Sequence, residues 1–275
     1  ARAVIDLSIK TGAELHVIHA WQDLPPTTYH ALALDGYSHA YEDEARRLLE
    51  AETQKIQEAG GTVAQAHLRE GRPADEIVAL ADDLDADLVV VGSRGAGAVK
   101  RLVMGSVSEG VVCLGSRPPL VMRGERAWPP RNVVIGDDSS EASKRAGNFA
   151  AGLGELFGAS VLLVQVYHHH LLTRSAKSRT PRRSEQILEA SHEALQRRAD
   201  KLARLLGRRP EVRVAVGDAA SVIQRVADER GAGTLVAVGS RGLGVVSRLT
   251  LGSVSTDVLR AIDGPVLVVR YPEER

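Results

Sequence analysis

One long pattern occurs twice in this chain, and it constrains the possible fold more than any other feature. The stretch "VGSRGAGAVKRLVMGSVSEGVV" (91–112) returns 147 positions later as "VGSRGLGVVSRLTLGSVSTDVL" (238–259). Each copy reads as the end of an apolar strand, Gly-Ser-Arg-Gly, nine residues, Gly-Ser-Val-Ser and an apolar helical run. Self-similarity at a fixed, long spacing indicates a repeated structural unit.

The repeat extends on both sides of these two loops. Residues 12–21 ("GAELHVIHAW") align with 158–167 ("GASVLLVQVY"). Residues 117–123 ("RPPLVMR") align with 264–270 ("GPVLVVR"). The similarity therefore covers whole domains rather than a single loop.

The joint between the copies lies at 124–132 ("GERAWPPRN"), because its proline pair resists both a helix and a central strand. We therefore predict two tandem copies of one domain, over residues 1–124 and 131–275.

Strands and helices alternate along each copy, as the second copy shows best. Its apolar strands are separated by segments of helical spacing and are apolar on both faces, which indicates a parallel sheet covered on both sides. Right-handed crossovers then give a doubly wound, five-stranded α/β domain of flavodoxin-like or Rossmann-like type. The expected strands are 132–136, 160–167, 211–217, 234–240 and 265–269, and the expected helices are 139–158, about 184–206, about 219–230 and one from Ser253.

The first copy has no counterpart of "RNVVIGDDSSEASKRA" (131–146), since Ala1 aligns with about Gly147. That segment carries the first strand and its turn. The first strand of a doubly wound sheet is internal, and without it the neighbouring strands keep unpaired backbone groups. We expect that about 16 or more residues precede Ala1 in the complete protein, or that another segment donates the strand.

Composition excludes several classes of partner. Lys plus Arg equals Asp plus Glu at 35 each, so no charge excess favours nucleic acid, and no apolar run approaches a membrane span. The single cysteine, Cys113, cannot form an intrachain disulfide and fits a reducing compartment, the cytoplasm. We expect neither a nucleic-acid nor a membrane partner.

The glycine loops have the composition of a phosphate site. Glycines after a strand permit positive φ and close approach of a ligand, and a Gly-Ser pair opening a helix offers free amides and hydroxyls to an anion. A simple turn with a serine N-cap is the alternative. The duplicated, gapless pattern favours the ligand site. The candidate residues are Gly92, Gly95, Gly105, Ser106, Val107 and Ser108 in the first copy, and Gly239, Arg241, Gly242, Gly252, Ser253, Val254 and Ser255 in the second.

These spacings resemble the G-2x-G-9x-G-[ST] signature of ATP-binding universal stress proteins, in the adenine nucleotide hydrolase-like superfamily. The resemblance implies an adenine nucleotide (ATP, or AMP or ADP), with Mg²⁺ as a possible companion. It also implies that Asp138 contacts the nucleotide and that backbone near Val166, and near Ala20 in the first copy, meets adenine. Ser139 replaces the family's usual glycine after the aspartate, where Ser tolerates positive φ less well.

The resemblance implies a stress-linked regulator or sensor rather than a vigorous catalyst, and no residue pattern recurs that would serve as a general base. Two alternatives stay open: a slow nucleotide hydrolase of the same fold, and a nucleotide-free protein-interaction module. The resemblance further implies pairing of the last strands, 119–123 with 266–270. Such pairing would make an intramolecular pseudo-dimer, and a homodimer is expected too.

Two other features are read as non-functional. The run His168–His170 has no fixed ligand geometry, so we predict no metal site. The basic stretch 171–184 has no apolar period and no basic counterpart in the first copy, so we interpret it as a loop, with a phosphate-facing lid as the alternative.

Overall fold

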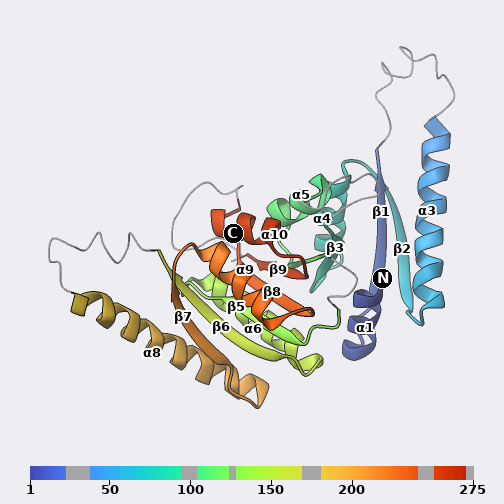
Figure 1. Ribbon diagram of the computed structural model, residues 1–275. Coiled ribbons are helices and arrows are strands. Elements are labelled where there is room, and N and C mark those ends of the chain that lie inside the picture. The colour runs from blue at the N-terminus through green and yellow to red at the C-terminus, as the bar shows by residue number, and fades with distance from the viewer. Residues whose placement is uncertain (23–37, 94–103, 124–127, 169–180, 241–250, 271–275) are drawn as a thin grey trace, which may run out of the picture. The chain divides into compact units, whose positions relative to one another are not determined.

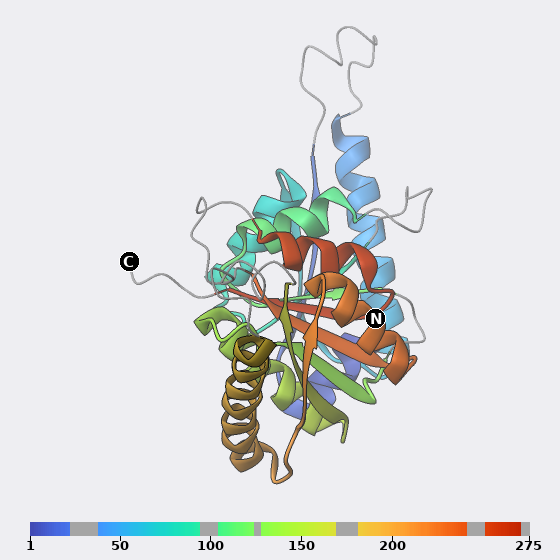
Figure 2. The same cartoon turned by 60° about the vertical axis from the view of Figure 1, so that its left-hand side comes forward.

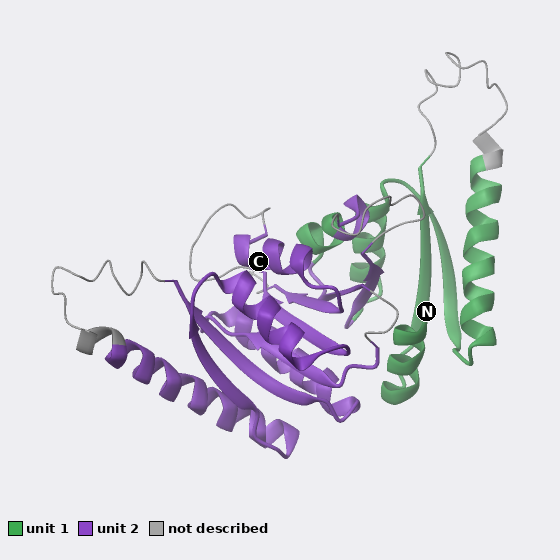
Figure 3. Ribbon diagram, in the orientation of Figure 1, with its two compact units in different colours: residues 1–86, 109–115 green, residues 87–108, 116–275 purple. Residues whose placement is uncertain are grey.

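The computed structural model describes residues 1–22, 38–93, 104–123, 128–168, 181–240 and 251–270 (Figure 1). It divides into two compact units (Figure 3). One comprises Ala1–Ala86 with Glu109–Gly115, and the other comprises Asp87–Ser108 with Ser116–Arg275. Each unit is described by itself.

The second repeat forms the predicted five-stranded parallel sheet. Its strands follow the order β9-β8-β5-β6-β7, so that the first strand of the repeat, β5, is central. The residues of β5 are apolar and almost fully buried, as a strand covered on both faces requires. The strands are β5 (Asn132–Gly136), β6 (Ser160–Tyr167), β7 (Glu211–Val216), β8 (Thr234–Gly239) and β9 (Val266–Val269).

Four helices cover this sheet in two pairs. The helices α6 (Glu141–Leu156) and α8 (Pro181–Leu206) pack against each other, as do α9 (Ala219–Arg230) and α10 (Ser253–Ala261). Because the chain reverses direction across the sheet after β7, right-handed crossovers place the two pairs on opposite faces (Figure 2). The helix α8 starts at Pro181, three residues before the predicted start at about 184, and proline is well suited to a first helical turn.

Two strands of the first repeat extend the same sheet. Here β3 (Val89–Gly92) pairs in parallel with β4 (Pro119–Met122), and β4 pairs antiparallel with β9. Leu120 lies opposite Leu267 and both are fully buried. The predicted pairing of the two last strands is therefore present, and it gives each apolar edge a partner.

The other described strands of the first repeat form a separate two-stranded parallel sheet, β1 (Leu15–Trp21) with β2 (Val63–Glu70). The strand order of the second repeat would place a counterpart of β5 between β1 and β3. Among the described residues of the first repeat, no strand occupies that place, and its described strands belong to two sheets. Its helices are α1 (Arg2–Thr11), α3 (Ser38–Glu58), α4 (Pro73–Asp83) and α5 (Ser106–Leu114).

Among the residues that the structure describes, no helix is both long and apolar enough to cross a membrane.

Candidate functional site

The base of the second glycine loop is closed by two backbone hydrogen bonds. The Ser240 amide donates to the Val269 carbonyl at 2.9 Å, and the Gly252 amide donates to the Ser240 carbonyl at 2.8 Å. The end of β8 and the start of α10 are thereby held together. The residues between them, including the candidates Arg241 and Gly242, lie outside the described residues.

The start of α10 carries open amides. Gly252 is its N-cap residue (φ −63°, ψ 152°), and the Thr256 amide donates to the Gly252 carbonyl at 2.9 Å. The amides of residues 253–255 precede that bond and have no acceptor within the helix. No side chain of the described residues caps this helix, whereas Ser140 caps α6 and Asp218 caps α9. An anion can therefore bind at the start of α10.

The serines of this helix start have different surroundings. Ser253 is exposed and Val254 is half-buried, but Ser255 is buried and its hydroxyl donates to the Gly239 carbonyl at 2.6 Å. In the first copy Ser108 is likewise buried and donates to the Gly105 carbonyl at 3.0 Å. In this structure both hydroxyls donate to the loop backbone, and their donation to phosphate stays a prediction.

Gly239 is required for space rather than for positive φ. It is the last residue of β8, and a Cβ placed there would lie 2.7 Å from the Ser143 amide nitrogen and 2.9 Å from the Ala142 carbonyl carbon. The positive φ that glycine permits is not used at Gly239 or Gly92, because both residues end strands. The close approach that glycine permits at Gly239 is to the first turn of α6.

The first loop repeats the same base. The Ser93 amide donates to the Met122 carbonyl at 2.9 Å, and the Gly105 amide donates to the Ser93 carbonyl at 2.8 Å. Ser106 and Val107, at the start of α5, are exposed. Gly95 lies outside the described residues. The backbone hydrogen bonds at the base of the glycine loop are therefore the same in both copies.

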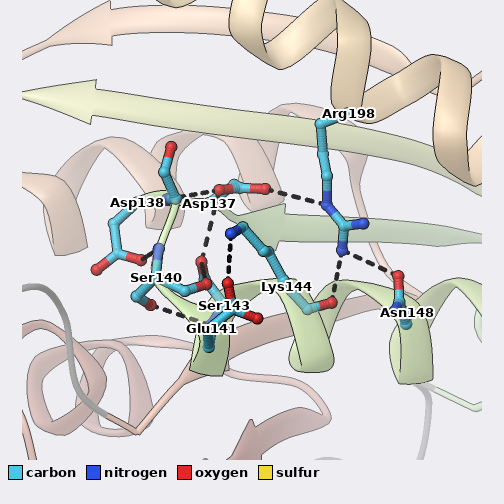
Figure 4. A network of polar contacts seen from close by, with 9 residues as sticks. Asp137, Asp138, Ser140, Glu141, Ser143, Lys144, Asn148 and Arg198 are labelled. Atoms are coloured by element: carbon cyan, nitrogen blue, oxygen red, sulfur yellow. Dashed lines mark hydrogen bonds and ion pairs between the residues drawn. The ribbon is translucent and has the colours of Figure 1, made fainter.

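The turn after β5 is stabilised by aspartate side chains (Figure 4). Ser139 has φ 68°, so the substitution of serine for the family's glycine does occur at a left-handed position. The Ser139 amide donates to Asp137 Oδ1 at 2.7 Å, and the Ser140 amide donates to Asp138 Oδ1 at 3.0 Å. Asp138 is exposed at the end of the turn, whereas Asp137 is buried.

Arg198 of α8 reaches the buried carboxylate of Asp137. Its Nε lies 3.6 Å from Asp137 Oδ2, and its Nη2 donates to the Lys144 carbonyl at 2.5 Å and to Asn148 Oδ1 at 2.9 Å. Figure 4 shows the guanidinium between the turn and α6. Lys144 itself donates to Glu141 at 2.5 Å, and this bond lowers the pKa of the Glu141 carboxyl.

Sequence reasoning missed both Asp137 and Arg198. A signal was present for Arg198, which lies three residues after Leu195 and four before Leu202, both buried positions of α8. An arginine at such a position on an amphipathic helix points toward the sheet and needs a buried partner. The partner itself could not be chosen from the sequence.

The sheet brings three of the predicted elements together. The strands β8, β5 and β6 are neighbours, so their C-terminal ends meet at one edge. The Asp137 amide donates to the Val164 carbonyl at 2.9 Å, which fixes the turn beside β6. Val166 is half-buried near the end of β6, in register with Ala215. In the first repeat, Ala20 on β1 is in register with Arg69.

The histidine run is only partly described. His168 is half-buried. Hydrogen bonds from the Ser221 hydroxyl and amide lower the pKa of Asp218, and His168 makes a smaller electrostatic contribution in the same direction. The described residues contain no group of three or more His, Cys, Asp or Glu side chains that could hold a metal ion. His169, His170 and residues 171–180 are outside the described part.

Comparison with known proteins gives a consistent result. The model of the Universal stress protein family matches residues 1–123 and 130–270. A universal stress protein of Mycolicibacterium smegmatis is 30% identical over 92% of this chain and 84% of its own length. One of Mycobacterium tuberculosis is 29% identical over 83% and 78%.

Among solved structures, a universal stress protein from Archaeoglobus fulgidus has a TM-score of 0.66 at 24% identity, covering 97% of this chain and 91% of that one. The structural similarity supports the fold, and the two matches of the family cover nearly the whole chain. The chain belongs to the universal stress protein family.

Proposed function

We propose that this chain binds an adenine nucleotide, ATP or its di- or monophosphate, in its second repeat and acts as a stress-response regulator in the cytoplasm. The observation that carries the proposal is the open start of α10 at the closed base of the glycine loop. Helix-start amides that have no acceptor within the helix suit phosphate, while the adjacent strand ends provide a carboxylate and backbone groups.

Each part of the nucleotide has a candidate partner. The amides of residues 253–255 and the Ser253 hydroxyl would hold phosphate. Asp138 would lie at the ribose, because its carboxylate is exposed at the end of β5. The backbone near Val166 would meet adenine. Mg²⁺ would accompany the phosphates, as it commonly does for ATP.

Regulation is favoured over rapid catalysis. The described turn contains two carboxylates, but Asp137 is paired with Arg198 and Asp138 accepts from the Ser140 amide. Both carboxylates of the turn thus make structural contacts within the turn or with α8. Slow hydrolysis is therefore an alternative outcome of the binding test, as is a protein-interaction module that takes up no nucleotide.

Ser253→Pro tests the phosphate contact directly. Proline is well accepted at the first position of a helix but has no amide hydrogen, and the ψ of 152° at Gly252 suits a following proline. We expect calorimetric titration with ATP to show binding that is weaker by roughly tenfold or more, the value of a charge-assisted hydrogen bond.

Ala219→Pro is the matched control, because it places the same residue at the first position of α9, which Asp218 caps. It should leave the affinity for ATP unchanged. No uptake of ATP by the unmodified protein would overturn the proposal, and equal loss in both proline variants would show a general helix effect instead of a phosphate contact.

A further inference from the structure

The turn after β5 adopts a conformation that its sequence does not favour. Among the described residues, Ser139 is one of two non-glycine residues with positive φ. The left-handed conformation brings Cβ close to the following carbonyl, so such a residue needs support from its surroundings. Asp137 supplies that support through the 2.7 Å bond from the Ser139 amide to its Oδ1.

Asp137 in turn depends on a cation. Its side chain is only 4% exposed, and a buried carboxylate is tolerated only when it is paired. Arg198 provides the opposite charge from α8, with its own side chain 15% exposed. Two bonds to α6, at the Lys144 carbonyl and Asn148, hold the guanidinium in place.

We infer that Arg198 is a positioning residue of the nucleotide site, acting through Asp137 on the turn that presents Asp138. The inference rests on the proposed function, but the contacts that carry it belong to the turn itself. Without Arg198, the buried charge of Asp137 loses the cation that faces it and keeps only the hydrogen bonds from the Ser139 amide and the Ser143 hydroxyl, so the carboxylate moves toward solvent. The Ser139 amide then loses its acceptor, the left-handed turn relaxes, and Asp138 moves with it.

The test uses Arg198→Met, which keeps the length of the side chain but removes its charge. Two properties are measured: the affinity for ATP, and the hydrogen-exchange rate of the Ser139 amide without nucleotide. We expect affinity to fall about tenfold, as the penalty for one strained left-handed residue would produce, and exchange at Ser139 to accelerate.

Two rescues distinguish positioning from simple anchoring of α8. Ser139→Gly removes the strain, because glycine adopts this φ freely. Asp137→Asn keeps an oxygen acceptor for the Ser139 amide but needs no cation. Either change, added to Arg198→Met, should restore most of the affinity. Arg230→Met, which breaks the 2.5 Å pair with Glu211, is the control and should leave both measurements unchanged.

Unchanged affinity and exchange in Arg198→Met would overturn the inference. So would a loss that neither Ser139→Gly nor Asp137→Asn restores. If Arg198→Met alone does not fold, the double variant Asp137→Asn/Arg198→Met decides: binding like the unmodified protein supports the inference, and failure to bind overturns it. If the unmodified protein binds no ATP, the proposed function fails, and exchange at Ser139 still decides whether Arg198 holds the turn.

Discussion

The two glycine loops have the same base but different surroundings. In both copies a serine amide bonds to the last strand, and a glycine amide bonds back to that serine. Among the residues that the structure describes, only the second copy has a strand beside the loop that ends in an aspartate turn, at Asp137 and Asp138. The described base of the loop is thus duplicated, whereas the described carboxylates that we propose for the nucleoside lie beside the second loop. The difference makes the second repeat the better candidate for the nucleotide.

The largest effect is expected from a change where strand β4 of the first repeat pairs with strand β9 of the second. Leu120 of the first repeat is fully buried against Leu267 of the second. Leu120→Asp places a charge in that contact, and we expect unfolding to become easier by about 4 kcal/mol or more. Denaturant unfolding measures the loss, with Leu114→Asp at an exposed position as control. An unchanged unfolding midpoint would show that the pairing of β4 with β9 does not stabilise the protein.

A second test concerns the glycines that end β8 and β3. Gly239→Ala brings a methyl group against the first turn of α6, and we expect a loss of about 1–3 kcal/mol in stability. Gly92→Ala occupies the equivalent but exposed position and should change stability by less than about 0.5 kcal/mol. Thermal unfolding compares the two variants. Equal effects would mean that the approach of α6 to β8 does not explain the requirement at Gly239.

How much the sequence predicted differs between fold and site. The alternation of apolar strands and helices was sufficient to predict the order of elements in the second repeat, and the repeat itself led to the pairing of 119–123 with 266–270. These features follow from burial and backbone pairing, which leave a periodic trace.

The site was less predictable because its chemistry depends on contacts between distant segments. The sequence showed Gly239 as a loop glycine, but only the structure shows that α6 fills the space beside it. The family resemblance predicts Asp138 as a nucleotide contact. The neighbouring Asp137 forms an ion pair with Arg198, sixty-one positions later in the chain. Pairings of this kind leave no local pattern.

The two helix starts offer a sharper test of the loops. Ser106→Pro removes from the first loop the same amide and hydroxyl that Ser253→Pro removes from the second. We expect Ser106→Pro to change ATP affinity less than about twofold, since the aspartate turn among the described residues lies beside the second loop. Titration calorimetry of both variants measures the difference. Equal weakening would contradict the assignment of the nucleotide to the second repeat.

The smallest expected effect is at the edge strands. Burial, with contributions from His16 and Arg69, lowers the pKa of His67 on β2, so the unfolded chain binds protons more readily there. Neutral His67 contributes to stability at pH values above the pKa of this histidine in the unfolded chain, about 6.5. The stability of the folded state falls as the pH decreases through that value. The protection of the β2 amides against exchange, measured relative to the intrinsic exchange rate at each pH, should therefore decrease below that pH, and less so in His67→Gln.

The aligned position on β7 predicts a different response. Arg213 donates to Glu229 at 2.6 Å and lowers the pKa of that carboxyl. The ion pair of Glu229 with Arg213 keeps its charge down to pH values below the ordinary carboxyl range, about 4. The protection of the β7 amides, measured relative to the intrinsic exchange rate at each pH, should therefore not change between pH 7 and 5. Identical pH responses of β2 and β7 would remove this difference between the repeats.

Counting the nucleotide carried by the purified protein tests the central claim most directly. The protein is saturated with ATP, freed of excess nucleotide, denatured, and the released nucleotide is identified and counted by chromatography with mass detection. For a chain that comprises residues 1–275, we expect a single adenine nucleotide, lost in Ser253→Pro and retained in Ser106→Pro. Two nucleotides on this chain, or none after incubation with ATP, would contradict the assignment of the nucleotide to the second repeat.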